Sequence, residues 1–229
     1  MTSRGRRTIA SPGNIRSVVL LHGVWSHGAG LLIPKLHLER EYDFDVHLFN
    51  YRSVSRTLDE NAEALHAFIV EHDLSKSHLV GHSLGGVVLL RMLTHHPRAV
   101  SGRVVCLGTP VKGSRAARVL SMNDWGDAVL GRSLKTGVTS NSASEWAHDV
   151  VADYDVGVIA GDAPYGVGHL ITDFDGPSDG TVAVAETELD GQADHIVMPL
   201  SHNGLVRSRR AADQVAAFLK RGEFLRDVE

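Results

Sequence analysis

The sequence predicts one α/β domain with a doubly wound, mainly parallel six-stranded sheet. Six short runs are nearly continuous in Val, Ile and Leu, which is typical of strands buried on both faces of a parallel sheet. Helical patterns alternate with these runs, as they do in doubly wound folds. A chain of 229 residues is long enough to bury one large core, so we expect residues 1–229 to form a single domain.

The elements follow one another with recognisable boundaries. The strands are expected at residues 17–22, 44–49, 77–82, 103–108, 156–161 and 194–200. Thr57 and Glu60 have the spacing of a capping box, and apolar residues then repeat on one helical face. A second helix is expected from Ser83 until Pro97 stops it, and a last helix from about 205 to 220.

Charge and cysteine content exclude several classes of protein. The 23 Lys and Arg against 27 Asp and Glu leave a slightly negative charge, so no nucleic-acid partner is expected. No apolar run reaches membrane-spanning length and no signal-peptide pattern opens the chain, which predicts a cytoplasmic protein without a transmembrane segment. The single cysteine, Cys106, lies in an expected strand and is interpreted as a buried core residue. Nothing in the sequence indicates the oligomeric state.

The 14 histidines raise the question of a metal site. His95 and His96 are adjacent at a helix end, where we expect them to face different directions. His78 and His82 bracket a strand, so their spacing does not bring both rings to one ion. The sequence has neither an H-E-x-x-H motif nor a cysteine set. We therefore expect no metal and no other cofactor.

The stretch Gly81-His82-Ser83-Leu84-Gly85 joins an expected strand directly to an expected helix. This G-x-S-x-G pattern in that context predicts a nucleophile elbow, in which small residues let the strand and helix approach closely. A serine needs a general base to act as a nucleophile. The N–H of Leu84 opens the helix and is a candidate donor to an oxyanion.

A second glycine-bearing corner ends the first expected strand. His22 and Gly23 close the run "SVVLLHG", and the backbone of Val24 is the candidate second oxyanion donor. We interpret His22 as structural support for this loop.

Four motifs occur in a characteristic order: "LLHG", "GHSLGG", "LGTPVKGS" and "PSDGTV". In these the chain resembles bacterial lipases and esterases of the α/β-hydrolase superfamily, from the first strand to the final helix. The resemblance implies a minimal, six-stranded α/β-hydrolase fold, because the chain opens almost directly on the "VVLLHG" strand. It also implies a catalytic triad of nucleophile, acid and base at Ser83, Asp179 and His202, in the chain order that this fold uses.

Other histidines and acids compete for these roles. His202 follows the last strand and so belongs to the catalytic edge, whereas His195 lies at the opposite end of that strand. His169 precedes Asp179, which would reverse the expected order. Asp162 directly follows the fifth strand and is the alternative acid.

The connection at residues 111–151 is long enough to carry a small helical cap or lid. Its apolar side chains fit either ordinary core packing or an acyl pocket, for which Trp125 and Trp25 are the candidate lining residues. The prediction is thus a serine hydrolase of carboxylic esters, acting on a small-molecule or lipid substrate of undetermined acyl length. A thioesterase, acyltransferase or amidase with the same triad, and a catalytically silent binding protein on this fold, are the alternatives.

Overall fold

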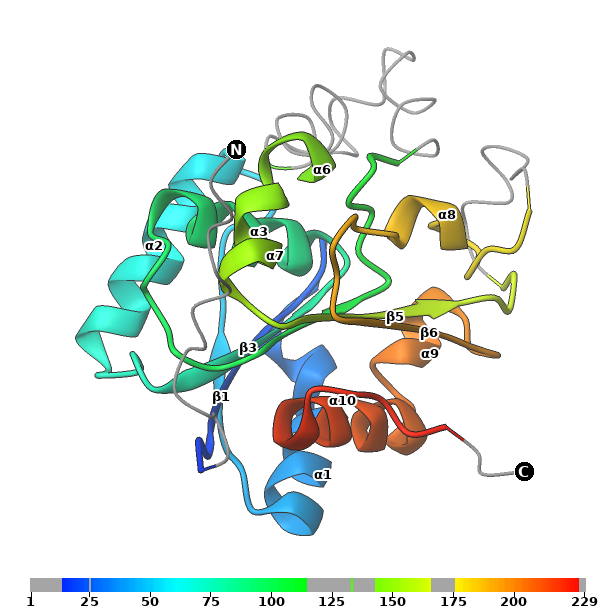
Figure 1. Ribbon diagram of the computed structural model, residues 1–229, viewed down its shortest axis with the longest axis horizontal. Helices are drawn as coiled ribbons and strands as arrows, with labels where there is room; N and C mark the ends of the chain where they lie inside the picture. Colours follow the sequence, from blue (N-terminus) through cyan, green and yellow to red (C-terminus); the bar gives the residue numbers. More distant parts are fainter. Residues whose placement is uncertain (1–13, 25, 115–132, 134–142, 166–175, 227–229) are drawn as a thin grey trace, which may run out of the picture.

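A single all-parallel sheet forms the centre of the computed structural model (Figure 1), which describes residues 14–24, 26–114, 133, 143–165 and 176–226. The strand order is β2-β1-β3-β4-β5-β6. The strands are β1 (Ser17–Leu21), β2 (Asp45–Phe49), β3 (Ser77–His82), β4 (Val104–Leu107), β5 (Val156–Gly161) and β6 (Asp194–Met198). The predicted sheet is therefore confirmed, and each strand ends within two residues of its expected limits.

Helices cover both faces of this sheet (Figure 1). One face carries α2 (Leu58–Glu71), α3 (Leu84–His95), α6 (Ala143–Trp146) and α7 (His148–Asp153). The other face carries α1 (Leu32–Tyr42) and α10 (Arg209–Arg221). The short elements are η1 (Gly28–Leu31), α8 (Val184–Thr187) and α9 (His202–Leu205). The expected last helix is α10, which begins at Arg209, four residues later than expected, after the separate short helix α9.

Helix α1 has no counterpart in the sequence prediction. Its sequence, LIPKLHLEREY, buries only Pro34 and Leu38, so its apolar side is too narrow to produce a helical repeat. By contrast, α2 has the predicted capping box, in which Thr57 accepts the N–H of Glu60 and the Glu60 carboxylate accepts the N–H of Thr57.

The strands are buried on both faces, as their continuous apolar runs predict. Leu21 and Leu79 pack toward α2 and α3, while their neighbours Leu20 and Val80 pack toward α1 and α10. Cys106 lies in the first of these two cores, and burial raises the pKa of its thiol to about 12. This environment agrees with a packing role for the cysteine.

Most of residues 111–151 lies outside the described ranges, so the expected cap or lid stays a prediction. The described end of this segment forms α6 and α7, both packed against α3. Within the described ranges, no helix has the length and apolar character needed to cross a membrane.

Phe218 links α10 to the sheet and provides a test of this packing. Its ring is fully buried, contacts Phe224 at a centroid distance of 4.9 Å, and lies against Gly157 of β5. We expect Phe218→Ala to lower the free energy of unfolding by about 3–5 kcal/mol, because it leaves a cavity in the core. Urea denaturation measures this loss, with Val70→Ala at an exposed position of α2 as the control, expected to change stability by about 0.5 kcal/mol or less. Equal effects of the two substitutions would contradict the prediction.

Candidate active site

Ser83 occupies a sharp turn between β3 and α3. Its backbone has φ 54° and ψ −124°, a conformation that residues with a side chain rarely adopt. The Ser83 N–H donates to the carbonyl of Leu107 on the neighbouring strand at 2.9 Å. A Cβ at Gly81 would lie 2.5 Å from the backbone N of Gly86, and one at Gly85 would lie 2.6 Å from the backbone oxygen of His22. The two glycines of the motif are therefore required by close backbone approach.

Asp179 and His202 form a buried pair, with 2.6 Å between the carboxylate Oδ2 and the imidazole Nδ1. The other carboxylate oxygen accepts the N–H groups of Thr181 and Val182 at 2.9 and 2.7 Å. The backbone N–H of His202 also donates to the carbonyl of Asp179 at 2.9 Å. Because a carboxylate only accepts hydrogen bonds, Nδ1 is the donor in this contact, and Nε2 is the nitrogen that bears the lone pair in the neutral ring.

The competing acid and histidines have different surroundings. Asp162 is exposed, and its N–H donates to the carbonyl of Met198 at the end of β6. The ring of His195 lies 3.2 Å from the Thr187 hydroxyl, at the start of β6. His169 is outside the described residues.

The elbow and the acid–base pair share one edge of the sheet. Gly108 directly follows Leu107, the residue whose carbonyl binds Ser83, and a Cβ at Gly108 would lie 3.0 Å from Asp179 Oδ2 and 3.2 Å from His202 Nδ1. Among the described residues, no hydrogen bond joins the Ser83 hydroxyl to the His202 ring. Such contacts are commonly long before substrate binds.

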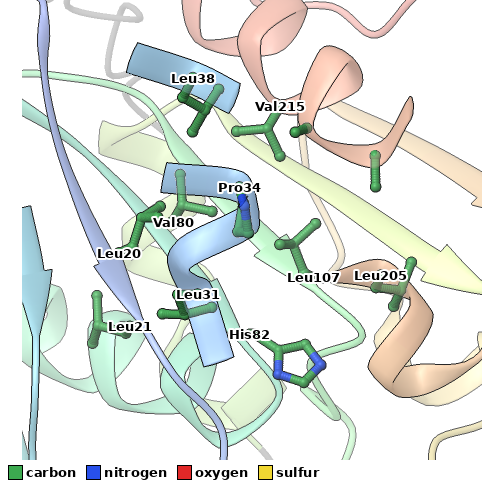
Figure 2. Close-up of a pocket in the computed structure, with 12 residues that line it drawn as sticks. Leu20, Leu21, Leu31, Pro34, Leu38, Val80, His82, Leu107, Leu205 and Val215 are labelled. Carbon is green, nitrogen blue, oxygen red and sulfur yellow. The ribbon is translucent and has the colours of Figure 1, made fainter. Parts of the chain in front are cut away.

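His82 supports the backbone of His202. Its ring nitrogen Nε2 donates to the His202 carbonyl at 3.0 Å, and the centroids of the His82 and His202 rings lie 4.7 Å apart. Burial lowers the pKa of His82 to about 3, so the ring is neutral. Figure 2 shows this ring at one end of an apolar pocket between the sheet and the helices α1 and α10. Sequence reasoning weighed His82 only as a metal ligand and missed this contact, which joins residues far apart in the chain.

His22 and Tyr51 form the matching support on the other side of the elbow. The rings stack at 4.5 Å, and the Tyr51 hydroxyl donates to the His22 carbonyl at 2.7 Å. His22 Nδ1 donates to the Gly23 carbonyl at 2.8 Å, and Nε2 accepts the Tyr51 N–H at 3.4 Å. Burial lowers the pKa of His22, which keeps the ring in this neutral form. The expected loop support by His22 agrees with these contacts, whereas no sequence pattern identified Tyr51.

The two candidate oxyanion donors flank Ser83. Leu84 is the first residue of α3, so its N–H has no acceptor within the helix. Val24 follows Gly23, where a Cβ would lie 3.1 Å from the Cβ of Ser83. The candidate pocket residues Trp25 and Trp125 lie outside the described residues.

Comparisons with known proteins place this geometry in context. A family model described as a domain of unknown function (DUF7379) matches residues 2–156. The mature lipase BlEst2 of Bacillus licheniformis is similar in structure, with a TM-score of 0.74 and 19% identity over 89% of this chain and 90% of that chain. The phospholipase PlaB of Legionella pneumophila has a TM-score of 0.70 and 15% identity, over 90% of this chain and 59% of that chain.

A metagenomic carboxyl esterase, MGS0156, is similar with a TM-score of 0.68 and 17% identity, over 90% of this chain and 76% of that chain. These likenesses confirm the predicted α/β-hydrolase fold. A comparison of the sequence with curated proteins found no match.

The buried neutral histidines predict a loss of stability in weak acid. Burial lowers the pKa of His82 to about 3 and that of His78 in β3 to about 4. Below about pH 6.5 the unfolded chain therefore binds protons that the folded chain excludes, so stability falls as the pH falls. Between about pH 7 and pH 5 we expect a loss of about 2 kcal/mol from each group.

Urea denaturation at the two pH values measures this loss. His78→Gln is the matched variant, because an amide oxygen can still accept the Arg103 N–H that His78 Nδ1 accepts at 2.8 Å. Whatever its stability at neutral pH, this variant should show a pH dependence smaller by about 2 kcal/mol. The same pH dependence in both proteins would contradict the prediction.

Proposed function

The chain belongs to the family described as a domain of unknown function (DUF7379), and we propose that it is a serine hydrolase of carboxylic esters that forms an acyl-enzyme on Ser83. The observation that carries this proposal is the buried 2.6 Å contact between Asp179 and His202 beside the strained serine elbow. That contact leaves the lone pair of His202 Nε2 unused by the acid. A general base needs such a lone pair.

In the first step, His202 Nε2 takes the proton of the Ser83 hydroxyl while the serine oxygen bonds to the ester carbonyl carbon. The carbonyl oxygen gains negative charge in the resulting tetrahedral intermediate. We assign the N–H groups of Leu84 and Val24 as the donors to this oxygen, aided by the positive end of α3. Collapse of the intermediate breaks the ester C–O bond, and the departing alcohol receives the proton from His202.

In the second step, water attacks the acyl group on Ser83. His202 takes a proton from the water and returns it to the serine oxygen as the acid is released. Asp179 holds the imidazole in one orientation and stabilises its charged form in both steps. The two N–H groups that bind the other oxygen of Asp179 prevent the carboxylate from rotating away.

For the substrate we propose a small-molecule or lipid ester. The similar solved structures are named as a lipase, a phospholipase and a carboxyl esterase, which supports ester chemistry without specifying the acyl chain. Hydrolysis rates for p-nitrophenyl esters of increasing acyl length would define that preference.

Covalent labelling tests the nucleophile. We expect a fluorophosphonate probe to label the wild-type protein and to leave Ser83→Ala unlabelled, because only an activated serine reacts. The same substitution should lower kcat for an ester substrate on the order of 10⁶-fold. Mass spectrometry of the modified peptide and circular dichroism of the variant complete the measurement. A folded wild-type protein that does not react with the probe would instead support the silent binding protein.

Matched substitutions test the acid. Asp179→Asn should lower kcat by about 10⁴-fold, because the amide no longer holds the imidazole in the required tautomer. Asp162→Asn is the control, since the Asp162 side chain is exposed and Asp162 contacts β6 through its backbone. Its kcat should stay near the wild-type value. If Asp162→Asn lowers kcat strongly and Asp179→Asn does not, the assignment of the acid is wrong.

A further inference from the structure

A cluster of imidazoles and a carboxylate lies on the surface where α2 meets the end of α3. Glu63 and His66 are three residues apart in α2 and therefore lie on the same side of that helix. His95 ends α3, and His96 follows it as the helix cap. We call Glu63, His66, His95 and His96 the Glu63 cluster.

The contacts within the Glu63 cluster are close. His96 Nε2 lies 3.0 Å from each carboxylate oxygen of Glu63, and His95 Nδ1 lies 3.3 Å from one of them. The ring of His66 stacks on that of His96, with 3.6 Å between centroids and 6° between planes. The expectation that His95 and His96 face different directions is therefore wrong, because α2 brings one carboxylate within reach of both rings.

We propose that the Glu63 cluster binds a divalent transition metal such as Zn²⁺, with Glu63, His66 and His96 as ligands. One ligand atom from each of these residues lies within 4.8 Å of the other two. Imidazole nitrogen and carboxylate oxygen are the ligands that suit Zn²⁺, Co²⁺ and Ni²⁺. The site is independent of the ester hydrolysis proposed above, since Ser83 lies at the opposite end of α3.

Metal binding requires a small rearrangement of the ligands. The His66 and His96 rings are nearly parallel, so the lone pairs of their nitrogens do not point at one ion, and the stack has to open before both rings can bind it. All three residues are at least partly exposed, which leaves their side chains room to rotate without movement of the helices. His95 is then within reach as a fourth ligand, or water completes the coordination.

The charged groups at this surface favour a cation. Hydrogen bonds from His96 and His95 lower the pKa of Glu63, so the carboxylate is charged and attracts a cation. Asp59 on α2 and Arg91 on α3 also face the cluster, and they pair with each other at 2.6 Å. Arg91 balances the charge of Asp59, so the attraction for a cation comes from the Glu63 carboxylate.

Metal titration of the full-length, untagged protein after EDTA treatment tests the proposal. We expect wild type to bind one equivalent of Co²⁺, seen by visible absorption, and one of Zn²⁺, seen by calorimetry, at about pH 7.5. His66→Asn and His96→Asn should each weaken binding at least about tenfold.

His72→Asn is the matched control, because His72 caps α2 and its ring contacts the carbonyl of Phe68 instead of the Glu63 cluster. Its affinity should equal that of wild type. The proposal is overturned if wild type shows no saturable binding of one equivalent, or if His66→Asn, His96→Asn and His72→Asn all bind the metal equally well. Both outcomes leave the labelling of Ser83 unchanged, so this proposal and the proposed hydrolase activity fail separately.

Discussion

The strained backbone at Ser83 is the constraint on which the rest of the site depends. The positive φ of Ser83, at the point where the strand passes directly into the helix, costs on the order of 1–3 kcal/mol. The surrounding packing has to hold the backbone in this conformation. The hydrogen bond from Ser83 to Leu107 and the tight glycine contacts provide that restraint. The same turn places the N-terminus of α3 at the edge of the sheet where Asp179 and His202 meet.

The histidines around this edge divide into two kinds. His22 and His82 are buried against backbone groups, and burial lowers the pKa of each. They therefore act as neutral hydrogen-bonding groups that hold loops in place. Of the three described histidines at this edge, His22, His82 and His202, the last alone pairs with a buried carboxylate. This difference in partners separates the candidate base from the residues that position it, although all three rings lie near the same corner.

Helix α3 connects two regions of different chemistry. Its first turn adjoins the serine elbow inside the protein, and its last residue reaches the surface beside Glu63. Burial excludes charge at the first end, whereas exposure and a carboxylate favour cations at the second. An ion at the Glu63 cluster would bridge α2 and α3 and so stabilise the packing behind the elbow.

The sequence by itself determined the six strands, the capped helix α2 and the turn at Ser83, because these depend on burial patterns and on residues adjacent in the chain. The resemblance to bacterial lipases and esterases favoured Asp179 as the acid, with Asp162 as the alternative, because each of them follows a strand or turn that could reach the edge. Only the tertiary structure decided that Asp179 contacts His202 and that the Tyr51 hydroxyl binds the His22 carbonyl. The same holds for the contacts of His95 and His96 with Glu63. The physical reason is that such pairings depend on how distant segments pack in space. Local periodicity in the sequence does not determine that packing.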